Sequence, residues 1–195
     1  MPKTQIRLHY KNVMADVIGD EHGITPAQLD NLADKTLPLI SRINQERKDG
    51  KRPYRDLPSR TETVEQVKKL TAQVKEGCEN LVVLGIGGSA LGNIALQTAL
   101  NPYMHNLDQS QRKGPRLFVF DNVDPAQFAS FLDWADDKLD KTIFNVISKS
   151  GRTAETASQL MIVRELLLDR LGGGGLQNQV IATTDFHKGT LRKIA

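Results

Sequence analysis

The sequence has one cysteine, Cys78, among its 195 residues. A lone cysteine cannot form an internal disulfide, and no set of cysteine and histidine has the spacing of a metal site, so we expect neither disulfides nor a bound metal. No run of about eighteen apolar residues is present, and the first residues do not resemble a secretory signal peptide. These absences favour a cytoplasmic protein that does not enter the membrane.

Aromatic residues are also scarce, at 5% of the chain, and the charges nearly balance, with 26 basic against 23 acidic residues. Because no long basic run occurs and few aromatics are available for stacking, we expect no nucleic-acid partner. The hydrophobic fraction of 39% is enough for one good core. The slight excess of basic residues favours an anionic metabolite over a nucleic acid as the partner.

Residues 80–92 contain an apolar run followed directly by a glycine-rich turn. The run from Leu81 to Leu84 predicts a strand buried in a parallel sheet. Gly85, Gly87 and Gly88 lack Cβ atoms, which permits positive φ and close approach of an anion to the backbone N–H groups. Ser89 precedes a predicted helix over residues 90–100, whose N-terminus favours phosphate. A tight turn without a ligand remains an alternative for this segment alone.

Residues 141–155 repeat the order of strand, polar loop and helix. Residues 143–147 predict the strand, and residues 154–171 have apolar positions at helical spacing. Thr153 stands at the N-cap position of that helix. Hydroxyls, cations and free N–H groups in one loop are typical of a phosphate site. The candidate loop residues are Ser148, Lys149, Ser150, Gly151, Arg152 and Thr153.

Two further strand-and-helix units complete the pattern, with strands predicted over residues 117–120 and 179–183. Asp124 and Pro125 predict the start of the helix after the first of these, and a last helix begins near residue 189. Four such units predict an α/β fold with an open, doubly wound parallel sheet. Right-handed crossovers then bring both polar loops to the same edge. The glycines at 172–175 predict a helix C-cap and a flexible loop.

Residues 1–58 are expected to form a mostly helical segment and linker, and residues 59–195 the sheet domain. Thr25, Pro26 and Gln28 match a capping box with proline at the first helical position. A second helix is predicted after Ser59. Its apolar positions are expected to face inward, at Val64, Val67, Leu70 and Val74.

Four stretches, in their order and spacing, resemble the sugar isomerase (SIS) domain of the glucose-6-phosphate isomerase (phosphoglucose isomerase) family. They are GIGGSALG at 85–92, FVFDNVDP at 118–125, ISKSGRTAET at 147–156 and ATTDFHKGTLRKIA at 182–195. The resemblance covers roughly residues 64–195 and implies the N-terminal portion of an enzyme of glycolysis and gluconeogenesis. Such an enzyme interconverts glucose 6-phosphate and fructose 6-phosphate, needs no cofactor and forms a homodimer.

In that family the two loops hold the sugar phosphate, which implies this role for Gly88 and Ser89 and for residues 148–153. Arg152 departs from the family pattern, where a small hydroxyl residue is usual, and we expect its side chain to face solvent. The family's glutamate base, its histidine and lysine and its enediol-binding arginine belong to segments beyond Ala195, as does the second SIS domain. The resemblance therefore implies phosphate binding without a catalytic residue. The histidines match no family catalytic motif and are expected to be structural or solvated: His9, His22, His105 and His187.

Two alternatives remain open at this point. The residues 85–90 also satisfy the dinucleotide-binding pattern G-x-G-x-x-(G/A), with Asp121 as the ribose-binding acid, but Asp121 comes much later than the usual distance of about twenty residues. The second alternative is a regulatory SIS module that binds a sugar phosphate without converting it. A helix-turn-helix in the first residues would favour this module, and residues 25–50 do not predict one.

Overall fold

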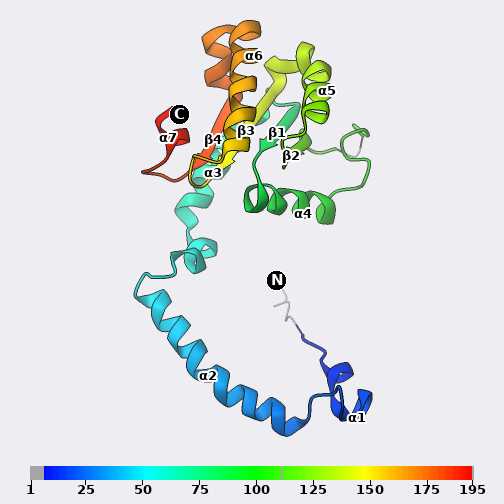
Figure 1. The fold of residues 1–195 in the computed structure, drawn as a ribbon. Helices are drawn as coiled ribbons and strands as arrows, with labels where there is room; N and C mark the ends of the chain where they lie inside the picture. The colour runs from blue at the N-terminus through cyan, green and yellow to red at the C-terminus, as the bar shows by residue number, and fades with distance from the viewer. Residues whose placement is uncertain (1–6, 111, 195) are drawn as a thin grey trace. The chain divides into compact units, whose positions relative to one another are not determined.

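The structure is a computed structural model that describes residues 7–110 and 112–194. Figure 1 shows the fold and labels its main elements. The chain divides into two compact units, Met1–Glu65 and Gln66–Ala195. This division by contacts does not test the domain boundary expected at residues 58 and 59, which stays a prediction.

The first unit is helical. It contains the 3₁₀ turns η1 (Lys11–Val13) and η2 (Pro53–Ser59) and the helices α1 (Ala15–Ile18) and α2 (Pro26–Lys48). The predicted capping box at the start of α2 is confirmed: the Gln28 amide donates to Thr25 Oγ1 at 3.2 Å, and the Thr25 amide donates to Gln28 Oε1 at 2.8 Å. The helix continues through Pro38.

Helix α3 (Thr61–Lys75) crosses the division between the units. Most of the apolar face expected to point inward does not do so, since Val64, Val67 and Leu70 are 44%, 57% and 40% exposed, and only Val74 is half-buried. That prediction is wrong because a periodic apolar pattern identifies a helical face but not whether another element covers it.

The second unit contains a four-stranded parallel sheet of β1 (Asn80–Leu84), β2 (Arg116–Phe120), β3 (Thr142–Ser148) and β4 (Val180–Thr184). The strand order is β2-β1-β3-β4. Leu84 at the end of β1 is in register with Phe120 on β2 and with Val146 on β3. The predicted α/β fold with a doubly wound parallel sheet is confirmed.

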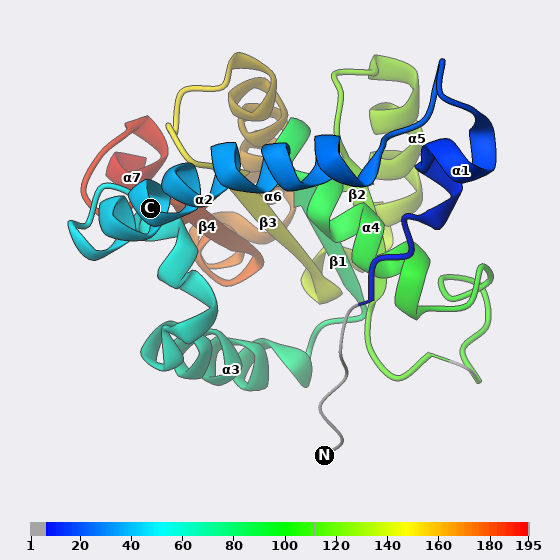
Figure 2. The ribbon, with the colours of Figure 1, turned by 90° about the horizontal axis from the view of Figure 1, so that it is seen from below.

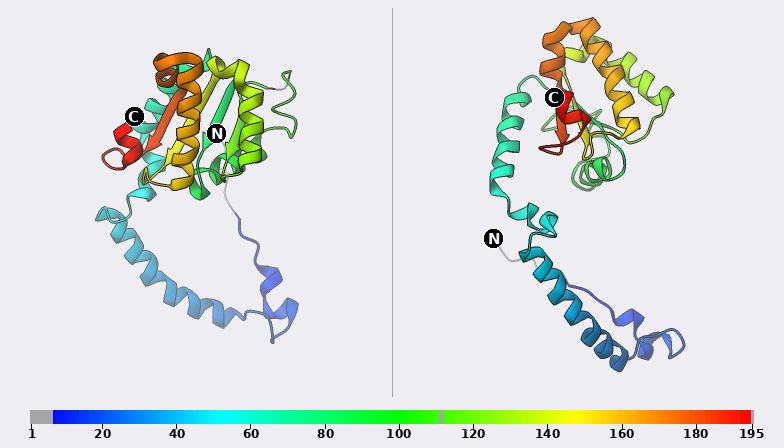
Figure 3. Two further views of the ribbon diagram at one scale, coloured as in Figure 1. Left: turned by 45° about the horizontal axis from the view of Figure 1, so that its top comes forward. Right: turned by 60° about the vertical axis from the view of Figure 1, so that its left-hand side comes forward.

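Helices follow every strand of the sheet. They are α4 (Leu91–Leu100) after the turn η3 (Gly87–Ser89), α5 (Pro125–Ala135) with η4 (Asp136–Lys141), α6 (Ala154–Gln179) and α7 (Thr190–Ile194). Figure 3 shows α5 and α6 side by side on one face of the sheet, whereas α4 runs across the lower end of the sheet in Figure 1. Helix α4 has no buried residue.

The core lies between the sheet and the α5–α6 layer. Alternate strand positions point into it, because successive side chains of a strand face opposite sides. Its most buried members include Val82, Leu84, Phe144, Val146, Val163 and Leu167. This packing anchors the strands whose carboxyl ends carry the polar loops.

The glycine run after residue 171 is only partly as predicted. Gly172 breaks the helix with φ 69° and ψ −170°. The residues after it resume a helical conformation up to Gln179 instead of forming a loop. The composition correctly indicated the break, but not that the chain would form another helical turn before β4.

No helix among the described residues is long and apolar enough to cross a membrane.

Candidate phosphate-binding site

The chain reverses its direction of travel across the sheet between β1 and β3. From β1 it moves outward to β2, and from β2 it crosses back to β3 on the other side of β1. Such a reversal leaves a crevice at the carboxyl ends of the two central strands, where ligands of open α/β sheets bind. The loops that leave β1 and β3 are the two loops predicted from the sequence. Figure 2 views the sheet from this edge.

In the first loop, Gly85 and Gly87 meet different requirements. A Cβ on Gly85 would lie 2.8 Å from Ser89 Cβ and 3.2 Å from the Ile147 carbonyl oxygen of β3, so the missing side chain lets the first loop pass close to the end of β3. Gly87 has φ 56°, a conformation that favours glycine. Gly88 has no positive φ, and a Cβ there would meet nothing within 4 Å. The space beside Gly88 is therefore open.

The first loop also offers hydrogen-bond donors. Gly87–Ser89 form a short 3₁₀ turn, and the N–H groups that begin a helical turn have no partner inside it. The Ser89 side chain is half-buried, and its hydroxyl bonds to no described residue. The loop can therefore contribute backbone N–H groups and one hydroxyl to an anion.

The second loop is built around Ser148, which is 4% exposed. The Gly151 amide donates to Ser148 Oγ at 3.1 Å and to the Ser148 carbonyl at 3.2 Å. Gly151 has φ 63°, and a Cβ on it would lie 2.9 Å from the Leu191 amide nitrogen. The loop thus has one conformation that only glycine at this position accommodates.

Thr153 is the N-cap residue of α6 by position, but its hydroxyl does not cap the helix. Thr153 Oγ1 lies 3.1 Å from Ser148 Oγ instead. The amides of the first turn of α6 therefore lack a side-chain cap, and two hydroxyls stand together at the helix N-terminus. Both features suit an incoming oxyanion, which accepts from N–H and O–H donors.

The two cations of the loop, Lys149 and Arg152, are exposed, and their side chains pair with no described residue. The Arg152 amide donates to Ser150 Oγ at 3.2 Å. The expectation that Arg152 faces solvent agrees with this exposure. Both side chains add positive charge near the loop without being ordered by it.

A cavity of about 360 Å³ adjoins the second loop. Ser148, Gly151 and Thr153 line it together with apolar residues of α6 and α7, including Leu160 and Leu191. Thr156 also lines it; this residue is 2% exposed, and its hydroxyl has no hydrogen-bond partner in the described part of the chain. Thr156 was not among the predicted site residues, because a threonine in the first turn of a helix has no distinctive sequence signal.

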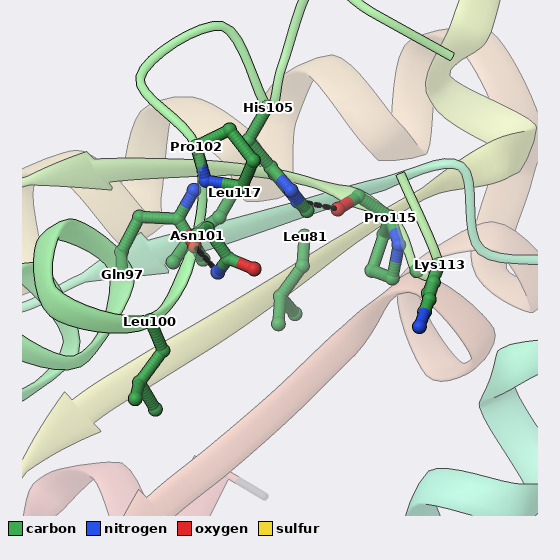
Figure 4. Close-up of a pocket in the computed structure, with 10 residues that line it drawn as sticks. Leu81, Gln97, Leu100, Asn101, Pro102, His105, Lys113, Pro115 and Leu117 are labelled. Atoms are coloured by element: carbon green, nitrogen blue, oxygen red, sulfur yellow. Dashed lines mark hydrogen bonds between the residues drawn. The ribbon is translucent and has the colours of Figure 1, made fainter. Parts of the chain in front are cut away.

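A second cavity, of about 510 Å³, contains none of the predicted site residues. Figure 4 shows it between the end of α4 and the strand residues Leu81 and Leu117. His105 lies here, 8% exposed, and its Nε2 is 3.3 Å from the Pro115 carbonyl oxygen. A carbonyl only accepts, so Nε2 carries the hydrogen. This contact supports the expected structural role of His105.

Within the described residues, no group of three or more histidine, cysteine or acidic side chains is arranged to hold a metal ion. The site therefore consists of hydroxyls, amides and two exposed cations at helix N-termini. That set can bind a phosphate or a similar oxyanion by hydrogen bonding and charge.

Comparison with known proteins gives consistent matches. The family model for phosphoglucose isomerase matches residues 46–190. A glucose-6-phosphate isomerase of Carboxydothermus hydrogenoformans is 38% identical over 97% of this chain and 40% of its own length. A glucose-6-phosphate isomerase of Rubrobacter xylanophilus is 34% identical over 93% of this chain and 42% of its own length. The chain thus spans less than half of the curated relatives that it matches.

A crystal structure of a hypothetical protein from Thermus thermophilus has the same fold, with a TM-score of 0.70 and 31% identity. The match covers 85% of this chain and 38% of that protein.

Proposed function

Because the chain belongs to the phosphoglucose isomerase family, we propose that its two loops bind the phosphate of glucose 6-phosphate and fructose 6-phosphate. The parent protein interconverts these two sugars. The residues proposed to bind the phosphate are Gly88, Ser89, Ser148, Lys149, Ser150, Gly151, Arg152 and Thr153.

One observation is the main support for the proposal. The two loops follow the carboxyl ends of β1 and β3, the neighbouring strands between which the chain changes direction across the sheet. A Cβ on Gly85 would lie 3.2 Å from the Ile147 carbonyl oxygen of β3, so the first loop passes close to the end of β3 here. A phosphate between the loops would receive donors from both helix starts, each of which favours negative charge. Hydrogen bonds to a charged acceptor contribute about 1.5–3 kcal/mol each.

The residues differ in the atoms that they offer. Ser89, Ser148, Ser150 and Thr153 contribute hydroxyls, Gly88 leaves its backbone accessible, and Gly151 permits the turn of the second loop through its positive φ. Lys149 contributes mainly its backbone N–H, since its side chain is exposed. Arg152 contributes long-range positive charge.

The proposal assigns no proton-transfer group to this chain. Moving a proton between C1 and C2 of the sugar requires a positioned base, and the family resemblance puts that base outside these residues. The chain is therefore expected to bind sugar phosphate without turnover. A cytoplasmic location and a homodimeric parent enzyme, without a nucleic-acid partner, belong to the same proposal.

The test is calorimetric titration of the chain with glucose 6-phosphate, with glucose as the control that lacks the phosphate and NADH as the probe for dinucleotide binding. A coupled isomerase assay on the same sample measures turnover. Binding of glucose 6-phosphate but not of glucose or NADH is the expected result. NADH binding without a response to the sugar phosphate would contradict the proposal in favour of the dinucleotide alternative.

Variants locate the binding on the second loop. Ser148→Ala is expected to weaken glucose 6-phosphate binding about ten- to a hundredfold, the equivalent of one hydrogen bond to a charged acceptor. Ser158→Ala is the matched control, because its exposed hydroxyl lies on α6 and bonds to the Ala154 carbonyl, at 2.9 Å, and to no other described residue. Lys149→Ala is expected to weaken binding much less than Ser148→Ala. Equal losses for Lys149→Ala and Ser148→Ala would contradict the role given to the Lys149 backbone.

A further inference from the structure

The loop after β4 contacts the proposed phosphate loop through a side chain that the proposed function does not use. Thr184 ends β4 and is in register with Ser148, which ends β3. Thr184 Oγ1 donates to the Ser148 carbonyl at 2.7 Å. The same carbonyl accepts from the Gly151 amide at 3.2 Å. The Thr184 hydroxyl therefore binds the Ser148 carbonyl oxygen, the same atom that accepts the hydrogen bond closing the turn of the phosphate loop.

Two backbone contacts reinforce this support. The Leu191 amide donates to the Gly151 carbonyl at 3.3 Å. A Cβ on Gly189 would lie 2.4 Å from the Ser150 carbonyl oxygen, so the two loops pass as closely as glycine allows. Leu191 itself is 5% exposed and belongs to the core, which anchors the contact.

The loop after β4 is itself shaped by Asp185. Its Oδ1 accepts from the His187 amide at 2.9 Å and the Lys188 amide at 3.0 Å. These bonds lower the pKa of the Asp185 carboxyl, the His187 amide most of all. This turn leads the chain to Gly189, which lies next to the Ser150 carbonyl.

We propose that Thr184 is a positioning residue for phosphate binding: by holding the Ser148 carbonyl, its hydroxyl fixes where the Ser148 hydroxyl and the Gly151 N–H point. The inference rests on the proposed function of the loop. Thr184 touches no ligand itself. Its effect on affinity passes through Ser148, whose carbonyl accepts the Thr184 hydrogen bond while the Ser148 hydroxyl contacts Thr153.

The test compares Thr184→Val with Thr183→Val. Both substitutions replace a hydroxyl by a methyl of similar size on the same strand, where valine is favoured. Thr183 Oγ1 bonds to Asn145 Oδ1 at 2.8 Å and supports no loop. Thr184→Ser keeps the hydroxyl and serves as the rescue variant. The measurements are the dissociation constant for glucose 6-phosphate by calorimetry and the hydrogen exchange rate of the Gly151 amide without ligand.

We expect Thr184→Val to weaken binding about tenfold, the order expected when one supporting hydrogen bond is lost. Exchange at Gly151 becomes faster in the same variant. Thr183→Val is expected to stay within about twofold of the unmodified chain in affinity, and Thr184→Ser to recover most of the loss. If Thr184→Val binds glucose 6-phosphate as tightly as Thr183→Val, or if the Gly151 amide exchanges at the same rate in both variants, the proposal is overturned.

The two proposals fail in different ways. If the unmodified chain does not bind glucose 6-phosphate, the proposed function is wrong, and the role of Thr184 in phosphate binding falls with it. If the chain binds and Thr184→Val binds as well as Thr183→Val, only the role of Thr184 is wrong.

Discussion

At the scale of single residues, the second loop depends most on Gly151. Its φ of 63° lies in the left-handed region, and a Cβ would meet the backbone nitrogens of Leu191 at 2.9 Å and Thr190 at 3.1 Å. Neither neighbour is the end of a flexible side chain, so the backbone itself must shift. The left-handed backbone and the close contact would therefore both destabilise a variant with a side chain at Gly151.

Gly151→Ala is expected to lower the free energy of unfolding by at least about 2 kcal/mol, since left-handed backbone alone costs a residue with a Cβ roughly 1–2 kcal/mol. Gly174→Ala is the matched control. Gly174 is helical, and a Cβ there would meet nothing within 4 Å. Alanine is the better helix former by about 0.5–1 kcal/mol, so this control should be neutral or stabilising. Urea unfolding of both variants checks the prediction, and equal midpoints would contradict it.

At the scale of secondary structure, α5 shows how a local signal specifies where an element begins. Asp124 is its N-cap, and the Gln127 amide donates to Asp124 Oδ1 at 2.9 Å. Pro125 occupies the first helical position, where its missing N–H costs nothing. The predicted helix start is therefore confirmed in detail.

Asp124→Ala is expected to destabilise the chain by about 1 kcal/mol, the usual cost of losing an N-cap side chain. Asp133→Ala removes a carboxylate from an exposed position near the other end of α5 and should have little effect or a slightly favourable one, because negative charge is unfavourable there. Thermal unfolding followed by circular dichroism compares the two variants. A larger loss for Asp133→Ala would show that the cap does not govern the stability of α5.

At the scale of the whole sheet, Glu79 joins three strands near their amino ends. Its carboxylate lies 2.9 Å from Lys141 Nζ and 4.0 Å from Arg116 Nη1. The hydrogen bond from Lys141, with attraction to Lys141 and Arg116, lowers the pKa of the Glu79 carboxyl. The same pairing raises the pKa of Lys141.

The lowered pKa of Glu79 sets the direction of a pH effect. A carboxyl with a lower pKa in the folded state contributes stability above its unfolded pKa of about 4.3, and this contribution disappears as the pH falls through the folded value. Glu79→Gln should therefore be less stable than the unmodified chain at pH 7, with the difference vanishing as the pH falls below about 4. Urea midpoints at both pH values test this. Glu76→Gln, at an exposed neighbouring glutamate, is the control and should match the stability of the unmodified chain at pH 7.

The sequence by itself determined the features that depend on neighbouring residues. Helix caps at Thr25 and Asp124, the apolar strand runs and the glycine-rich turns follow from interactions within a few positions, so their patterns identify the elements and their order. The parallel fold follows from that order, because a strand-and-helix repeat has few other ways to bury its strands. The candidate loop residues were identified on the same basis.

Only the tertiary structure determined which distant segments of the chain lie together. The order β2-β1-β3-β4 places the loops of β1 and β3 beside each other, and the sequence contains no local signal for that choice. The hydroxyl of Thr153 contacts Ser148 instead of capping its helix, and Thr184 supports the same loop from a strand 36 positions away. The exposed face of α3 was misjudged for the same reason. Burial and long-range hydrogen bonds depend on which surfaces meet, and a local pattern does not contain that information.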